Sequence, residues 1–205
     1  MTQGPELRGD RVLLRRWKPE DRGPFAALNA NPVVMEHFPA TLTPAQSDDL
    51  VDRVEGLFER NGYGLWALEV PGVTPFAGFV GLLEQTFPAH FTPAVEIGWR
   101  LSPDWWHHGF ATEAARLAVA FGFGSLALSE IVSMTSTTNL PSQAVMRRIG
   151  MHRDPADDFD HPSVPPGSPI RRHVLYRLSL DEWHARVAGS TPADGRIDRE
   201  GASSG

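Results

Sequence analysis

The sequence predicts a mixed α/β (α+β) fold, and three observations in the middle of the chain predict it. Residues 95–101 alternate apolar and polar side chains with period two until Pro103, which has no amide hydrogen for a strand ladder. After Gly109 the apolar residues recur at helical spacing, at Phe110, Ala114, Leu117, Ala118 and Phe121. A further strand is expected at 130–135, so the three segments form a parallel strand–helix–strand unit with ligand sites beyond its carboxyl ends.

The N-terminal part of the chain contributes one strand and two helices. Residues 11–17 predict the strand, and a first helix starts near Pro19 with two residues facing inward, Phe25 and Leu28. The second helix begins with a capping box made by Thr43 and Gln46, and it ends at Gly62. Its buried stripe is expected to be Leu50, Val54, Leu57 and Phe58.

A hairpin and a short helix flank the central unit. Strands at 65–70 and 76–83 are expected to pair, because the residues between them are turn formers, and 85–93 is expected to be a loop. A short helix is expected from Asn139 to Gly150. Its inward residues are expected to be Ala144, Val145, Met146 and Ile149.

The C-terminal part is expected to end the domain. Residues 153–170 are rich in Asp and Pro and predict a loop, and 173–178 predicts the last clear strand. Ser179 and Glu182 form a capping box for a terminal helix. One domain over residues 1–188 is expected, followed by a flexible tail at 189–205 that is rich in small and polar residues.

Composition narrows the classes of function. The 205 residues contain no cysteine, so disulfides, thiolate metal sites and a cysteine nucleophile are excluded. A net charge of −6 argues against a broad nucleic-acid-binding surface, because such surfaces concentrate Lys and Arg. No apolar run is long enough to cross a membrane, and the N-terminus lacks a signal-peptide pattern. A cytoplasmic protein is the expectation.

The entrance of the helix after Gly109 suits an anion. First-turn amides have no partner within their helix, and the helix dipole adds partial positive charge there. With only a hydrogen as its side chain, Gly109 lets a pyrophosphate approach these amides closely. The alternative is that the small residues only allow tight packing of strand against helix.

Longer motifs carry a resemblance to the GCN5-related N-acetyltransferase (GNAT) superfamily. Its cofactor loop, Gln/Arg-x-x-Gly-x-Gly/Ala, reads here Trp106-His107-His108-Gly109-Phe110-Ala111, and Thr112-Glu113-Ala114 resembles the branch of ribosomal-protein N-terminal acetyltransferases (RimJ/RimL-like). Residues 139–151 and the opening 13–21 are similar too, so the likeness spans roughly 7–183. It implies a mixed, mostly antiparallel sheet of about six or seven strands, flanked by helices and splayed at a parallel pair.

The resemblance also implies a cosubstrate, acetyl-CoA, and no metal. Transfer is direct in this family, so no nucleophilic side chain is needed. In this family the pantetheine arm forms hydrogen bonds with the main chain of the central strand, and the cofactor loop holds the pyrophosphate. The residues implied to bind the cofactor are Gly98, Trp99, Leu101, Trp106, His107, His108, Gly109, Phe110, Ala111, Thr112, Asn139 and Ser142.

Two residues are candidates for proton transfer. Glu96 is the candidate general base, acting through water, and the alternative is a structural glutamate paired with Arg100 or a neighbouring strand. Ser142 is the candidate group that protonates or hydrogen-bonds the leaving thiolate, and it lies in the first turn of the helix capped by Asn139. Capping and contact with the cofactor are compatible.

His108 stands where members of the branch commonly carry Arg or Lys. Since histidine titrates near neutrality, the grip on phosphate is expected to weaken as pH rises, unless the backbone amides alone do the holding. Acidic and aromatic residues in two loops are candidates for binding a cationic acceptor amine. The candidates named for the acceptor are His90, Phe91, Asp158 and His161.

Two other classes of function are alternatives. A metal hydrolase would use His90, His161, His173 and an Asp, but no spacing typical of metal ligands recurs. A non-catalytic acyl-CoA sensor or scaffold would carry the same cofactor motif. The expected partner is an amine, either a protein N-terminus or a small molecule, with no nucleic acid or membrane, and a homodimer is conceivable.

Overall fold

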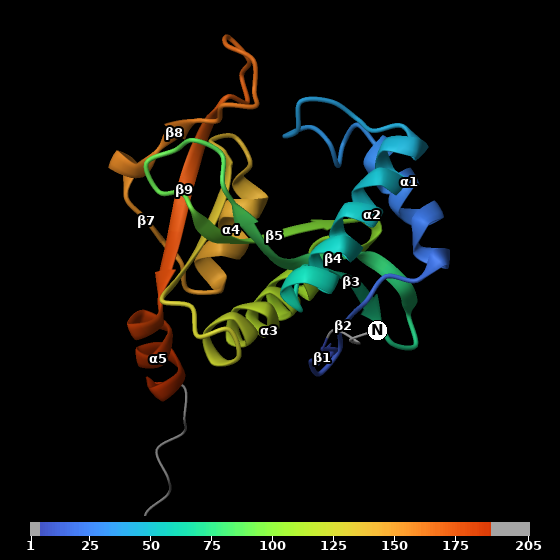
Figure 1. Cartoon of the computed structure of the whole chain (residues 1–205), viewed down its shortest axis with the longest axis horizontal. Helices are drawn as coiled ribbons and strands as arrows, with labels where there is room; N and C mark the ends of the chain where they lie inside the picture. The colour runs from blue at the N-terminus through green and yellow to red at the C-terminus, as the bar shows by residue number, and fades with distance from the viewer. Residues whose placement is uncertain (1–4, 190–205) are drawn as a thin grey trace, which may run out of the picture.

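The structure is a computed structural model that describes residues 5–189, and its centre is one twisted sheet (Figure 1). The strand order is β1-β2-β3-β4-β5-β6-β9-β7, and β8 pairs with β9. The strands are β1 (Leu7–Arg8), β2 (Leu13–Arg15), β3 (Leu65–Val70), β4 (Thr74–Gln85), β5 (Ala94–Leu101), β6 (Glu130–Ser136), β7 (His152–Arg153), β8 (Phe159–Asp160) and β9 (Arg172–Ser179).

Five helices flank this sheet within the described part of the chain. They are α1 (Arg22–Ala30), α2 (Pro44–Asn61), α3 (Phe110–Gly124), α4 (Leu140–Arg148) and α5 (Leu180–Gly189). Short 3₁₀ helices cover Pro19–Asp21, Pro103–Trp105 and Pro155–Asp157. The mixed α/β fold predicted from the sequence is confirmed, including the antiparallel hairpin of β3 and β4 and the parallel pair of β5 and β6.

The helix ends follow local capping rules. The Thr43 side chain accepts a hydrogen bond from the Gln46 amide, and Gln46 reciprocates, so the predicted capping box of α2 is confirmed. Gly62 ends α2 in the left-handed conformation with φ of 74°. Ser179 and Glu182 form the second predicted box at the start of α5.

Some inward faces differ from the sequence prediction. In α2 the fully buried positions are Ser47, Val51, Val54 and Phe58, whereas Leu50 and Leu57 are half-buried. The stripe turns toward Ser47 because its hydroxyl accepts a hydrogen bond from the buried Asn29 of α1 at 2.8 Å. A buried polar pair on α1 therefore changes which face of α2 lies inward.

Some predicted bounds also change. The first strand is shorter than 11–17, and the predicted loop at 153–170 contains the end of β7, a 3₁₀ helix and β8. The two short strands exist because they pair with the edge of β9, a partner that their own sequence does not reveal. The tail predicted at 189–205 falls outside the described residues apart from Gly189, which ends α5.

The two faces of β5 differ in what covers them. Register with β4 puts Glu96, Gly98 and Arg100 on one face and Ile97, Trp99 and Leu101 on the other. The Ile97 face packs on α3, while Phe25 of α1 lies against Phe79, which is the β4 partner of Arg100. Glu96 and Arg100 therefore share the face that lies away from α3.

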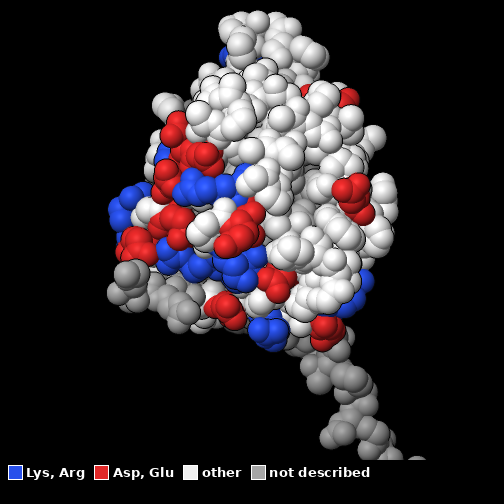
Figure 2. All heavy atoms as spheres, turned by 90° about the vertical axis from the view of Figure 1, so that its right-hand side faces the viewer, with Lys and Arg blue, Asp and Glu red and all other residues white. Residues whose placement is uncertain are grey.

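Charge on the side of α1 and α2 is mixed in sign (Figure 2). Arg16 pairs with Glu55 of α2 at 2.6 Å and with Glu59 of α2 at 2.8 Å. Arg22 of α1 pairs with two further acids of α2, Asp48 and Asp52. Interspersed acids and bases stabilise a solvated surface only weakly, and they give it no single-sign field. Among the described helices, none has the length and apolar character needed to span a bilayer.

Candidate functional site

The central strands β5 and β6 form the parallel pair at which the family resemblance implied a splay, and they separate along their length. They share one register pair, Glu96 with Val132. Just beyond it, the Ser133 hydroxyl donates to the Ile97 carbonyl at 2.8 Å, in place of a backbone ladder bond. The Ile97 main chain therefore points toward β6, and the strands separate from this residue onward.

Alternation along β5 then tells which main-chain groups line the opening. The Ser102 amide donates to the Ala77 carbonyl of β4 at 2.9 Å, so even-numbered residues direct their main chain toward β4. Trp99 and Leu101 point the other way, into the gap. The Leu101 carbonyl accepts from the Trp106 indole at 2.9 Å, which leaves both groups of Trp99 and the Leu101 amide for a ligand.

The entrance of α3 presents backbone amides without a side-chain cap. Gly109 is the N-cap with φ of 83°, and His107 also has a positive φ, of 63°. Both residues are exposed, as is the loop from Trp106 to Gly109. The first-turn amides of Phe110, Ala111 and Thr112 therefore face outward with the positive end of the helix dipole, which suits an anion.

A cation from the N-terminal strand region supports this entrance. The Arg11 amide and Nε donate to the Glu113 carboxylate at 2.7 and 2.8 Å, and Nη1 donates to the His108 carbonyl at 3.1 Å. His108 donates from Nδ1 to the Trp106 carbonyl at 2.7 Å, and its ring stacks on Phe110. Arg11 neutralises the acid nearest the helix start, and sequence reasoning missed it because the two residues are 102 positions apart.

Glu96 lies at the point where β5 and β6 diverge, and burial is the main influence on its carboxyl group. Burial raises the pKa of Glu96 to about 7, against hydrogen bonds from Gln85 and the Met134 amide that lower it. The Gln85 side chain donates to Glu96 at 2.5 Å. Of the two structural alternatives, pairing with Arg100 is wrong, because Arg100 forms its hydrogen bond with Asn29, whereas pairing with a neighbouring strand is confirmed by Gln85 of β4.

Ser142 lies in the first turn of α4, as predicted. The Asn139 side chain accepts from the Ser142 amide at 3.2 Å and donates to Thr135 at 2.9 Å, so the N-cap is held from both ends. The half-buried Ser142 hydroxyl makes no hydrogen bond within the described residues. It is therefore free to donate to a group at the positive end of α4.

The candidate acceptor loops pack against each other and pair their charges. His90 contacts Asp157 at 3.2 Å, and Asp157 also accepts from Arg177 at 2.7 Å. Asp158 is bidentate with Arg153. These carboxylates already have cationic partners, so they do not offer a free negative patch to an amine.

Aromatic rings join the same two loops. Phe91 packs on Phe159 with ring centroids 5.0 Å apart, and His161 lies 4.9 Å from both Phe87 and His173. Burial lowers the pKa of His161 and of His173. This cluster anchors the β4–β5 loop to β8 and β9, which gives Phe91 and His161 a structural role.

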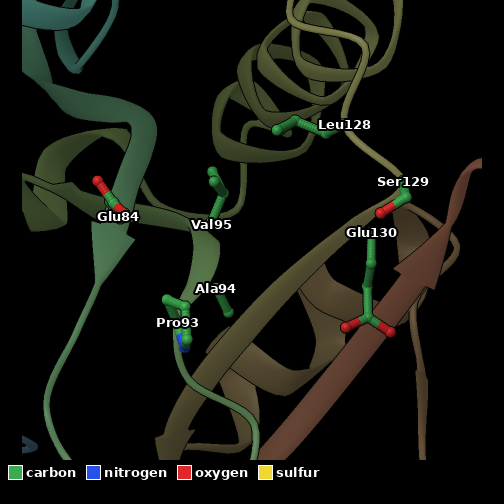
Figure 3. Close-up of a pocket in the computed structure, with 7 residues that line it drawn as sticks. All are labelled: Glu84, Pro93, Ala94, Val95, Leu128, Ser129 and Glu130. Carbon is green, nitrogen blue, oxygen red and sulfur yellow. The ribbon is translucent and has the colours of Figure 1, made fainter.

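The pocket drawn in Figure 3 lies elsewhere. It has a volume of about 280 Å³ and opens at the amino ends of β5 and β6, away from the gap beyond Ile97. Its lining residues are Glu84, Pro93, Ala94, Val95, Leu128, Ser129 and Glu130. Glu130 pairs with Arg177 at 2.8 Å, and no cluster of metal-ligating side chains occurs within residues 5–189.

Comparison with known proteins matches this arrangement. The family model of the acetyltransferase (GNAT) domain matches residues 11–152. The chain is 33% identical over 89 residues to YnaD of Bacillus subtilis, an uncharacterized N-acetyltransferase, covering 43% of the chain and 51% of the relative. It is 33% identical over 132 residues to FsC-acetyl coenzyme A-N(2)-transacetylase of Aspergillus fumigatus, covering 57% and 54%. The chain thus spans about half the length of these two curated relatives.

Solved structures show the same fold. A GNAT-family acetyltransferase from Bacillus anthracis superposes with a TM-score of 0.72 at 23% identity, over 86% of this chain and 99% of the other. RimL, a ribosomal L7/L12 alpha-N-protein acetyltransferase solved with coenzyme A, gives a TM-score of 0.69 at 13% identity, over 87% and 99%. At such identities the likeness extends to the fold alone.

Proposed function

Because this chain belongs to the GNAT acetyltransferase family, we propose that it moves an acetyl group from acetyl-CoA directly to a primary amine. One observation carries the proposal: beyond Ile97 the edge of β5 that faces β6 is unpaired, and the chain continues from the end of β5 to the uncapped entrance of α3. A thioester cosubstrate needs both a strand-like partner for its amides and a seat for its diphosphate. Acetyl-CoA supplies the activated acyl group.

The residues that would hold acetyl-CoA fall into two sets. Trp99 and Leu101 offer main-chain groups to the pantetheine arm, and the amides of 110–112 offer donors to the pyrophosphate. Gly98 contributes by having no side chain. The space where its Cβ would lie is open, with no atom within 4 Å, so a ligand has room there. The Leu101 carbonyl accepts a hydrogen bond from the Trp106 indole and is not available to the ligand. This bond fixes the loop that leads to the helix entrance.

Proton transfer would use one group on each side of the gap. Glu96 accepts a proton from the acceptor ammonium through water, and its pKa of about 7 leaves a substantial share of carboxylate at neutral pH. The free hydroxyl of Ser142 donates a hydrogen bond to the departing thiolate, where the α4 dipole favours negative charge. The main-chain amides at the β5 edge stabilise charge on the thioester oxygen.

The acceptor is a protein N-terminus, as in the name of RimL, or a small-molecule amine. Membership of the RimJ/RimL-like branch rests on the Trp106–Ala114 motif and stays a proposal, as do a cytoplasmic location and a homodimer. Sedimentation of the purified protein would test the homodimer.

Calorimetry and thiol release together test the function. Titration with acetyl-CoA should release heat with one binding site per chain, and thiol should appear only when an amine is added. Binding without turnover against a broad panel of peptides and small amines would favour the alternative, an acyl-CoA sensor or scaffold. Absence of binding would contradict both.

A further inference from the structure

Arg100 is a half-buried cation whose guanidinium Nε is fully buried, and the fold gives it no anionic partner within the described residues. Its Nη1 donates to the Asn29 side chain, its guanidinium lies 4.1 Å from the centroid of Phe38 and 5.5 Å from that of Phe79, and its Nε is buried without any hydrogen bond. No carboxylate within residues 5–189 forms an ion pair with it. Burial lowers the pKa of Arg100 to about 10.

Structural contacts alone do not account for this arginine. A guanidinium has five N–H donors, and Asn29 accepts from one of them. Cation–π contact with two rings offsets part of the desolvation, but a buried charge normally has a paired anion or more hydrogen bonds. Other arginines of the sheet follow that rule: Arg15 pairs with Asp21 at 2.7 Å and with Glu69 at 2.6 Å.

Arg100 and the candidate base lie on one face of β5. Glu96, Gly98 and Arg100 point the same way, and a spacing of four residues along a strand separates the outer two by roughly 13 Å. The position between them is a glycine with open space where its Cβ would be. The three residues make a shallow floor with a carboxylate at one end and a guanidinium at the other.

The loop from Asn31 to Thr43 covers the guanidinium end of this floor. Phe38 lies over Arg100 and is 37% exposed, and His37 contacts the Ser136 hydroxyl at 3.2 Å, near the end of β6. The loop thus runs from α1 across to β6, above the face that carries Glu96. A molecule on the floor would lie between this loop and the sheet, on the side of β5 away from α3.

We propose that Arg100 binds a carboxylate of the amine acceptor, so that the substrate class is a short peptide-like amine with an anionic group about three residues from its amino group. This inference rests on the proposed acetyl transfer, because Glu96 sets the position of the amine. An extended tripeptide measures about 10 Å from end to end, and the arginine side chain spans the remainder. The acceptor carboxylate supplies the anion that the protein lacks.

The direct test compares triglycine with triglycinamide as acceptors. The two have nearly the same amine, because the group that differs lies three residues away, so a difference in rate reports on the carboxylate. We expect kcat/KM for triglycine to exceed that for triglycinamide by roughly ten- to hundredfold. Glycine against glycinamide is the length control, since glycine is too short to reach from Glu96 to Arg100, and its carboxylate should bring no comparable gain.

Variants locate the preference at one side chain. Arg100→Gln should abolish the preference, so that its kcat/KM for triglycine equals its kcat/KM for triglycinamide, whereas Arg100→Lys should keep part of the preference, since it retains charge without the planar fork. Arg172→Gln is the matched control, because Arg172 lies on β9, exposed, and pairs with Asp160 at the surface. It should behave as the parent protein does.

The outcomes separate this inference from acetyl transfer itself. Equal kcat/KM for triglycine and triglycinamide in the parent protein would overturn the role of Arg100 while leaving the acetyltransferase intact. If no amine is turned over, the proposed function fails, and calorimetry of the coenzyme A complex with the same two peptides still decides the inference. Tighter binding of triglycine that Arg100→Gln abolishes supports it, and equal binding overturns it.

Discussion

Gln85 and Glu96 lie on the neighbouring strands β4 and β5, and the Gln85 side-chain amide donates to the Glu96 carboxylate at 2.5 Å. This bond favours the charged carboxylate, whereas burial, the larger influence, favours the neutral acid and raises the pKa of Glu96 to about 7. The opposed influences hold the group near the middle of its titration at neutral pH, which is where a general base is most effective.

The first prediction is an acidic limb in the pH profile. In the acetyl-transfer reaction, kcat/KM should rise with pH and level off above about pH 7, because Glu96 must be deprotonated to accept a proton. Glu96→Gln should lower kcat by about 10²–10⁴-fold and remove the limb. Gln85→Leu should move the limb to higher pH, since it deletes a donor that stabilises the carboxylate. Glu84→Gln is the control, and a limb that persists in Glu96→Gln would assign the base elsewhere.

The second prediction concerns stability and follows from the same raised pKa. Between the ordinary pKa of a glutamate, 4.5, and about 7 the folded chain holds a proton on Glu96 that the unfolded chain has lost. Glu96 therefore makes the free energy of unfolding fall as pH rises through this window. Glu96→Gln should melt at a higher temperature than the parent at pH 8, and the gap should close by pH 4.5. A gap of equal size at both pH values would contradict the raised pKa.

Local sequence signals predicted the regular elements well. The bounds of β3 were predicted as Leu65–Val70 and are confirmed, because turn formers lie on both sides of that strand. The boxes at Thr43 and Ser179 are confirmed because each involves residues only three positions apart. The parallel pair followed from the change of apolar period after Gly109.

Contacts between distant residues could not be predicted in the same way. Arg100 meets Asn29, 71 positions earlier, and Arg11 meets Glu113, 102 positions later. The residues of a single helix or strand do not indicate which distant residues it will contact. The partial burial of Arg100 could therefore not be predicted from the sequence. Its alternation with Glu96 on one face of β5 was the one available signal.

The third prediction separates capping from catalysis in the first turn of α4. Ser142→Ala should lower kcat about tenfold or more and leave the Kd of acetyl-CoA nearly unchanged, because the hydroxyl is required when the thiolate leaves. Asn139→Ala should instead cost roughly 1 kcal/mol of stability through loss of the N-cap. Thermal melting and single-turnover kinetics of both variants measure the difference. A Ser142→Ala protein that melts early and turns over normally would leave Ser142 with a capping role alone.

The fourth prediction concerns His108. A permanent cation at this position should strengthen the hold on the pyrophosphate, so His108→Arg should lower the Kd of acetyl-CoA, and more at low salt than at high salt. His107→Arg is a control for added charge on the same loop. An unchanged Kd in His108→Arg would mean that the amides of α3 hold the pyrophosphate without help from a charge at position 108.

The last prediction tests the pairing of Arg11 with Glu113 at the same entrance. Arg11→Leu leaves the Glu113 carboxylate unpaired in the first turn of α3, where it repels an incoming pyrophosphate. The Kd of acetyl-CoA should therefore rise severalfold, and more at low salt than at high salt, because screening weakens the repulsion. The double variant Arg11→Leu with Glu113→Gln should recover most of the affinity, since no charge is then left to repel. If the double variant binds as poorly as Arg11→Leu, then the hydrogen bond from Arg11 to the His108 carbonyl shapes the loop, and charge is not the cause.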